Sequence, residues 1–168
     1  MNLPRGFNAA ARFASVLAAM SLFTAPIAAP AADTAPPAGC TGPVSAHWLN
    51  VNVEGVRSGN GLIAITLYAD NPRKFLVKKG SLYVGRVDAQ QGTTHGCIFV
   101  PNPGVYVIAI YHDENGDMKF DRSGIGFPEE GFGFTNNPAT LAGLPSFRSV
   151  RLNVPRAGLS TTIRMKYP

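Results

Sequence analysis

After residue 31, the apolar residues of this chain stand in short runs that Gly, Pro, Asn or Asp interrupt. One run, residues 105–111 (VYVIAIY), is apolar at every position and directly follows the turn-forming pair Pro103-Gly104. Short runs without a 3.6-residue period are typical of β-strands. A strand that is apolar on both faces is expected at the centre of a sheet, covered on both sides. The sequence therefore predicts an all-β domain with this run as a central strand.

The same pattern predicts about six further strands. They are expected at residues 49–53, 62–68, 81–87, 97–100, 147–154 and 161–167. The first two flank the turn Ser58-Gly59-Asn60-Gly61 and are predicted to form a hairpin. About seven short strands in one domain favour a two-sheet, immunoglobulin-like sandwich, with a small closed barrel as the alternative. One long loop, from about residue 112 to residue 145, is expected between the central strand and the last two.

The start of the chain has the pattern of a secretory signal peptide. Arg5 and Arg12 precede an apolar run at residues 13–23, and Ala29-Pro30-Ala31 offers small residues for cleavage. That run is too short to span a bilayer comfortably, although a membrane anchor is the alternative interpretation. The expected organisation is a signal peptide at 1–31, a linker at 32–44 and a β-sandwich domain at 45–168.

Export has consequences for charge and for the cysteines. Removal of residues 1–31 leaves 13 basic and 10 acidic residues, so the formal charge falls from +5 to +3. This small excess does not indicate a nucleic-acid partner. Cys40 and Cys97 would meet an oxidising compartment, so we expect a disulfide that stabilises the fold by roughly 4 kcal/mol. The expected location is periplasmic or extracellular, with no transmembrane segment in the mature chain.

Oxygen-bearing side chains stand at alternate positions directly after the central strand. Their spacing matches positions one, three, five, seven and nine of a calcium-binding loop, with the seventh ligand a backbone carbonyl. The expected ligands of Ca²⁺ are Asp113, Asn115, Asp117, the Lys119 carbonyl and Asp121. The aromatic residue at position eight, Phe120, is expected to point into the core.

The match to a helix-flanked calcium loop is incomplete. Position six is Met118, where glycine eases the turn, and position twelve is Gly124, where a glutamate would bind with both oxygens. The missing oxygens would come from Glu129, Glu130 or water. The alternative is an ordinary hairpin with a type I′ turn at Asn115-Gly116 and solvated acidic side chains.

Aromatic residues alternate with glycines in the second half of the long loop. The candidate ligand surface consists of Phe127, Phe132, Phe134 and Asn136. Exposed, these aromatic side chains would offer a platform to a protein or glycan of the cell envelope. The alternative, which we favour for at least two of the three phenylalanines, is that they fold back and cover the sandwich.

No catalytic nucleophile or catalytic motif is identified in the sequence. His47, His95 and His112 lack the spacing of a zinc site. We therefore expect a protein that is not an enzyme. The alternative is a hydrolase of transthyretin-like fold in which His112 acts with Asp113 or Glu129 as acid and base. Tyr106, next to the Pro103-Gly104 turn, is expected to pack at a sheet corner and to bond backbone through its hydroxyl.

Three stretches of sequence resemble a bacterial exported family named domain of unknown function 2141. They are PNPGVYVIAIYHDENGDMKFD at 101–121, GIGFPEEGFGFTNN at 124–137 and GLPSFRSVRLNV at 143–154. The resemblance extends from about residue 49 to the end of the chain. It implies a β-sandwich similar to prealbumin-like and carboxypeptidase-regulatory-like domains, and a glycine in the family's acidic loop where this chain has Met118.

The sequence thus favours an exported β-sandwich module, binding or structural, with a loop organised by Ca²⁺ and a ligand that the sequence does not name. A transthyretin-like hydrolase and a purely structural domain with a metal-free, self-packed loop are the two alternatives.

Overall fold

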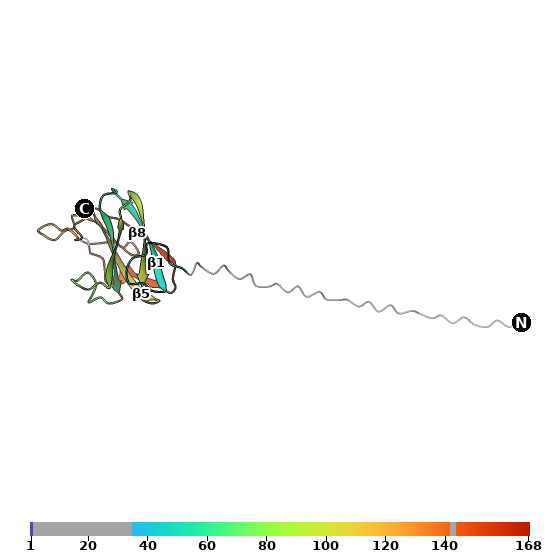
Figure 1. The fold of residues 1–168 in the computed structure, drawn as a ribbon. Helices are drawn as coiled ribbons and strands as arrows, with labels where there is room; N and C mark the ends of the chain where they lie inside the picture. Colours follow the sequence, from blue (N-terminus) through green and yellow to red (C-terminus); the bar gives the residue numbers. More distant parts are fainter. Residues whose placement is uncertain (2–34, 142–143) are drawn as a thin grey trace. The chain divides into compact units, whose positions relative to one another are not determined.

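Two β-sheets pack face to face in this protein (Figure 1). The computed structural model describes Met1, residues 35–141 and residues 144–168. Apart from Met1, the expected signal peptide and the first residues of the expected linker lie outside the described residues. The described elements are β1 (His47–Val56), β2 (Leu62–Ala69), β3 (Tyr83–Asp88), β4 (Gly92–Val100), β5 (Gly104–Asp113), β6 (Gly131–Phe134), the 3₁₀ helix η1 (Phe147–Val150), β7 (Arg151–Val154) and β8 (Leu159–Arg164).

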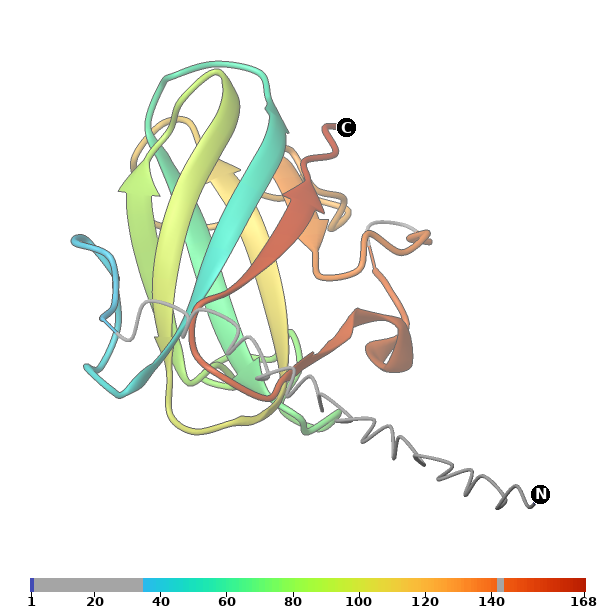
Figure 2. The same cartoon turned by 90° about the vertical axis from the view of Figure 1, so that its right-hand side faces the viewer.

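The smaller sheet has three strands in the order β4-β1-β8, and β8 runs parallel to β1. Figure 2 shows β8, in red, beside β1, in cyan. The larger sheet has the order β3-β2-β5-β6. Its fifth strand, β7, pairs with the beginning of β5, whereas β6 pairs with the end of β5. The expected all-β sandwich is confirmed.

The core lies between the two sheets and is built from alternate residues of each strand. Val51 and Val53 of β1 face Ile63 and Ile65 of β2, and all four side chains are fully buried. Ile108, the inner residue at the middle of β5, is fully buried as well. This two-residue period is what allows one face of each strand to form the shared core.

Strand β5 is the expected central strand, and it is buried on both faces. The outward-facing Val107 and Ala109 are buried under a second, smaller cluster that includes Phe134 and Val150. Tyr106 lies at the predicted sheet corner, where its hydroxyl donates a hydrogen bond of 2.8 Å to the Asn102 carbonyl. Both expectations for this part of the sequence are therefore confirmed.

Several local predictions are wrong. Strands β1 and β2 do not form a hairpin, because they belong to different sheets and the connection between them crosses the sandwich. Residues 147–150 form a 3₁₀ helix instead of the first half of a strand. The glycine-aromatic segment 131–134, expected in a loop, pairs with β5 as β6 and raises the number of described strands to eight.

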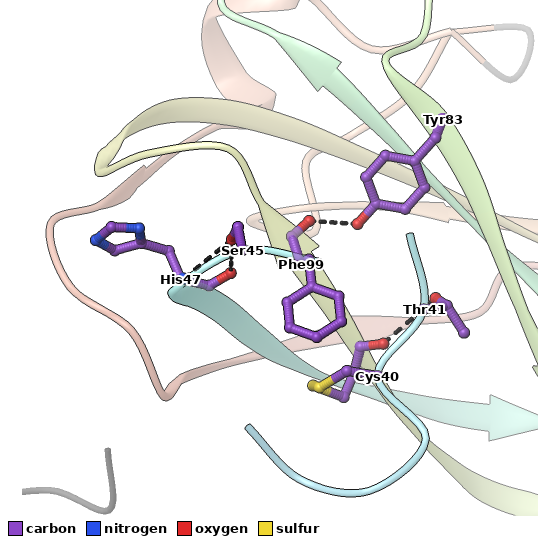
Figure 3. Close-up of a disulfide and its surroundings, with 7 residues drawn as sticks. Cys40, Thr41, Ser45, His47, Tyr83 and Phe99 are labelled. Atoms are coloured by element: carbon purple, nitrogen blue, oxygen red, sulfur yellow. Dashed lines mark hydrogen bonds between the residues drawn. A yellow bond between two sulfur atoms is a disulfide. The ribbon is translucent and has the colours of Figure 1, made fainter. Parts of the chain in front are cut away.

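The expected disulfide joins Cys40 to Cys97 of β4 and secures the last part of the linker to the sandwich (Figure 3). The Thr41 N–H donates to the Cys97 carbonyl over 2.9 Å, and the Phe99 N–H donates to the Thr41 carbonyl over 3.0 Å. The Tyr83 hydroxyl of β3 donates to the Phe99 carbonyl. Residues 40–42, which we call the strap, therefore extend the small sheet beyond β4.

The first prediction concerns this disulfide. Replacing both cysteines by serine is expected to lower the free energy of unfolding by roughly 4 kcal/mol, because the bridge closes a loop with a sequence separation of 57 residues. Urea unfolding of the double variant Cys40→Ser/Cys97→Ser and of the oxidised wild type measures the difference. Equal unfolding midpoints would contradict the prediction.

Candidate functional site

The acidic loop begins at Asp113, the last residue of β5, whose side chain is fully buried. Its carboxylate accepts hydrogen bonds from the Asp117 N–H at 3.1 Å and the Met118 N–H at 2.8 Å. The chain therefore coils around this one carboxylate. Met118 completes the coil with a φ of 66°, a conformation that glycine adopts at less cost than other residues.

The next two oxygen-bearing side chains continue the coil. The Asn115 Oδ1 accepts from the Asp117 N–H at 3.0 Å, and the Asp117 Oδ1 accepts from the Lys119 N–H at 2.9 Å. The Asn115 amide also donates to the Asp121 carboxylate at 3.0 Å. The alternative of a type I′ turn at Asn115-Gly116 is wrong, because such a turn needs a positive φ at both residues and only Gly116 has one.

A further carboxylate, from Glu130, joins the loop at its other end. Glu130 precedes β6, is only 6% exposed, and accepts a hydrogen bond of 3.1 Å from the Asp121 N–H. Burial raises the pKa of this carboxyl, and the charges of Asp121, Asp113 and Asp117 raise it further. From the sequence alone, Glu130 is only one of several possible sources of the Ca²⁺ ligands that the loop lacks. Its approach depends on β6, a strand that the sequence did not predict.

The acidic side chains accept hydrogen bonds from backbone N–H groups of the loop without any bound cation. In the part of the chain that the structure describes, no three His, Cys, Asp or Glu side chains are arranged as a metal-binding group. A carboxylate oxygen that accepts one hydrogen bond still has a lone pair for a cation, however. The donor set of carboxylates and one amide oxygen therefore has the chemistry that Ca²⁺ prefers.

The loop is attached to the outer face of the large sheet by Phe120. The expectation that Phe120 points into the core is wrong, because its half-buried ring packs on aromatic side chains outside the sandwich. The Phe120 ring lies 5.4 Å from the ring of Tyr111 and 6.4 Å from that of Phe132. Phe134 is buried, and Phe132 packs beside it, whereas Phe127 remains 51% exposed. Two of the three phenylalanines thus cover the sheet.

Asn136, the fourth residue of the candidate ligand surface, has a structural role here. Its side-chain amide donates to the Ser149 carbonyl at 3.1 Å and to the Arg151 carbonyl at 2.8 Å. Asn136 also has a positive φ of 65°, which asparagine tolerates better than most residues. These contacts hold the segment after β6 against η1 and β7.

His112 is fully buried, and both of its ring nitrogens have partners. Nε2 lies 2.8 Å from the Asn60 carbonyl and Nδ1 lies 2.8 Å from the Tyr167 hydroxyl. Because a carbonyl only accepts, we assign the proton of neutral His112 to Nε2, and Nδ1 then accepts from the Tyr167 O–H. The Arg57 N–H donates to the same hydroxyl over 3.0 Å. His112 therefore links the segment between β1 and β2 to the end of the chain.

An ion pair beside His112 fixes Glu114, the second residue of the acidic loop. The Arg57 guanidinium donates to both carboxylate oxygens of Glu114, and the Ser58 hydroxyl donates to Oε1 at 2.8 Å. The hydrogen bond from Arg57 is the largest cause that lowers the pKa of Glu114 to about 2. No spacing rule reveals this pair from the sequence, because its members lie 57 residues apart.

Comparison with known proteins identifies a family. A family model described as "Uncharacterized protein conserved in bacteria (DUF2141)" matches residues 51–163, more than half of the 168-residue chain. No curated protein and no solved structure matches. The described residues contain no helix that is long and apolar enough to cross a membrane.

The second prediction concerns the pH dependence of Glu114. Because the folded-state pKa is lowered, the ion pair contributes its full stability above the unfolded pKa of about 4.3, and this contribution is lost as pH falls toward about 2. Glu114→Gln is expected to lower the free energy of unfolding at pH 7 and to make progressively less difference as the pH falls toward about 2.

Unfolding at a series of pH values measures the effect. Glu54→Gln is the matched control, since Glu54 forms a more exposed pair with Arg164 at 3.4 Å and such pairs contribute little. Parallel stability curves for wild type and Glu114→Gln between pH 4.5 and pH 2 would disprove the role assigned to Glu114.

Proposed function

The chain belongs to the DUF2141 family, and we propose that it is an exported β-sandwich module, without catalytic activity, whose acidic loop binds Ca²⁺. The observation that carries the calcium proposal is the gathering of acidic groups at the loop. Asp113 and Glu130 are both buried, and they share the loop with Asp117 and Asp121.

These carboxylates have little cationic compensation from the protein. The Lys119 ammonium lies 3.5 Å from Asp117, but its side chain is 77% exposed. No salt bridge in the described part of the chain includes Asp113, Asp121 or Glu130. Like charges at close range and partial burial both disfavour the ionised state, and a divalent cation offsets both effects.

The proposed ligands are the five that the sequence predicts, together with Glu130. Glu130 would supply the carboxylate that is absent at position twelve, and it stands directly before β6, outside the coil at residues 113–121. The ligands would be Asp113, Asn115, Asp117, the Lys119 carbonyl, Asp121 and Glu130. Ca²⁺ would supply the positive charge that holds these oxygens together.

The surroundings of His112 support a role without catalysis. A general base must reach the proton that it removes. His112 is fully buried, and both ring nitrogens already have hydrogen-bonding partners. A transthyretin-like hydrolase that uses His112 would have to break these contacts. A purely structural domain remains the second candidate, because the loop is already held by its own hydrogen bonds.

Export is supported by two independent features. The first residues have the pattern of a signal peptide, and the chain contains a disulfide, which persists mainly in oxidising compartments. The exposed Phe127, at the far part of the acidic loop, is the aromatic side chain that we propose for contact with a protein or glycan of the envelope.

The third prediction tests calcium binding. Ca²⁺ is expected to raise the melting temperature relative to chelator, because a ligand present at 100 times its Kd stabilises the folded state by about 2.7 kcal/mol. Asp117→Asn should reduce this shift. Asp88→Asn, which alters an exposed aspartate at the end of β3, should leave the shift unchanged.

Differential scanning calorimetry and isothermal titration calorimetry provide the measurement. The same melting temperature with calcium and with chelator, together with no heat of binding, would favour the purely structural alternative.

The fourth prediction concerns Glu130 in the absence of calcium. Because its folded-state pKa is raised, the ionised carboxylate destabilises the fold at any pH above that pKa. Glu130→Gln keeps an oxygen that accepts from the Asp121 N–H, so the variant is expected to be more stable than wild type in chelator at pH 7. The same variant should respond less to Ca²⁺.

Thermal unfolding of Glu130→Gln in chelator and in calcium checks both parts. A variant that is less stable than wild type in chelator would contradict the statement that the ionised Glu130 carboxylate destabilises the fold. A variant that keeps the full calcium shift would remove Glu130 from the proposed ligands.

A further inference from the structure

A cleft of about 120 Å³ lies on the outer face of the large sheet, next to the acidic loop. Five of its ten lining residues are aromatic. The wall includes Tyr68 of β2, Tyr111 of β5, Phe132 and Phe134 of β6, Leu76 of the β2–β3 connection and Phe120 of the acidic loop.

The register of the large sheet explains why this space is open. Thr66 of β2 and Ala109 of β5 are paired neighbours, and Phe134 of β6 is paired with Ala109 on the other side. Two small side chains thus form the floor, while the rings of the adjacent outward-facing positions stand higher. The acidic loop then adds Phe120 as an upper wall.

One charged residue, Arg122, lines the cleft. The guanidinium carbon lies 4.7 Å from the centre of the Phe120 ring, and Nη1 donates to the Gly126 carbonyl at 3.0 Å. None of the salt bridges among the described residues includes Arg122. The guanidinium is therefore held in place by an aromatic ring and a carbonyl, and no carboxylate of the described residues lies within salt-bridge distance of it.

We propose that this cleft binds a small aromatic acid, with the ring between the aromatic walls and the carboxylate at Arg122. An apolar cavity of about 150 Å³ in another protein is large enough for benzene, and the cleft, at about 120 Å³ and open to solvent, is close to that size. Aromatic walls favour edge-to-face contact with a planar ring. A guanidinium pairs with a carboxylate through charge-assisted hydrogen bonds.

The lining favours an aromatic acid over a sugar. A pyranose needs several directed polar partners, and small-molecule sites supply such groups from their walls. Here the polar groups of the lining are confined to Thr66, two tyrosine hydroxyls and Arg122. The inference concerns the cleft itself and goes beyond the proposed calcium site.

Benzoate and its neutral analogue benzamide are suitable probes. Titration of the oxidised protein, followed by two-dimensional amide NMR, is expected to show saturable shifts for benzoate at Thr66, Ala109 and Phe134. Benzamide should bind about tenfold more weakly, because it cannot form the charged pair with Arg122. No saturable shift at these residues with either probe at tens of millimolar would overturn the proposal.

Two variants separate the parts of the proposal. Arg122→Gln should weaken benzoate binding to the level of benzamide, whereas the control Arg148→Gln, which changes an exposed side chain of η1, should leave both affinities unchanged. Ala109→Leu raises the floor and should weaken both probes, with amide spectra used to confirm the fold. An unchanged preference for benzoate in Arg122→Gln would overturn the assignment of the carboxylate to Arg122.

The titrations are carried out both in calcium and in chelator, so that the two proposals are judged separately. Benzoate binding in chelator supports the cleft even where no calcium binding is measured. A protein that binds calcium but shows no benzoate binding in either buffer overturns the cleft and leaves the calcium proposal intact.

Discussion

The buried carboxylate of Asp113 determines how the longest connection of the sandwich is arranged. A carboxylate without access to water must have hydrogen-bonding partners, and here two backbone N–H groups of the following turn provide them. Those bonds fix the direction of the chain, which in turn places Phe120 on the outer face of the large sheet. The acidic loop and the aromatic cleft are therefore two results of one buried charge.

Glycines of β6 allow the rest of the loop to return to the same place. A Cβ atom at position 133 would lie 2.8 Å from the Arg164 carbonyl oxygen, and one at position 131 would lie 2.3 Å from the Tyr167 ring. The end of the chain passes so close to β6 that only glycine fits on the inner side. The outer side can then carry Phe132 and Phe134, and Glu130 is delivered to the carboxylates of the loop.

The sequence predicted those features of the fold that depend on residues close together in the chain. A strand that is apolar on both faces was placed correctly at residues 105–111, and the alternate spacing of Asp113, Asn115 and Asp117 correctly indicated a coiled loop. The predicted hairpin of the first two strands was wrong because a hairpin and a connection that crosses between sheets have the same local pattern. The choice between them depends on contacts with residues far away in the sequence. For example, Gly61 packs so closely against the Asp113 carbonyl that a Cβ atom at position 61 would lie 1.9 Å from its oxygen. The same reasoning applies to the candidate site: Glu130 and the Arg57–Glu114 pair depend on contacts between remote segments.

The strap has a consequence for how newly made chains behave. β4 is an outer strand, and in the finished molecule its open hydrogen-bonding groups at Cys97 and Phe99 are used by Thr41. An unprotected outer strand is a template on which other chains can add, which leads to aggregation. Oxidation therefore does more than add stability. The disulfide keeps the strap on the open edge of β4, so a chain that is still reduced is the one most prone to edge-to-edge aggregation.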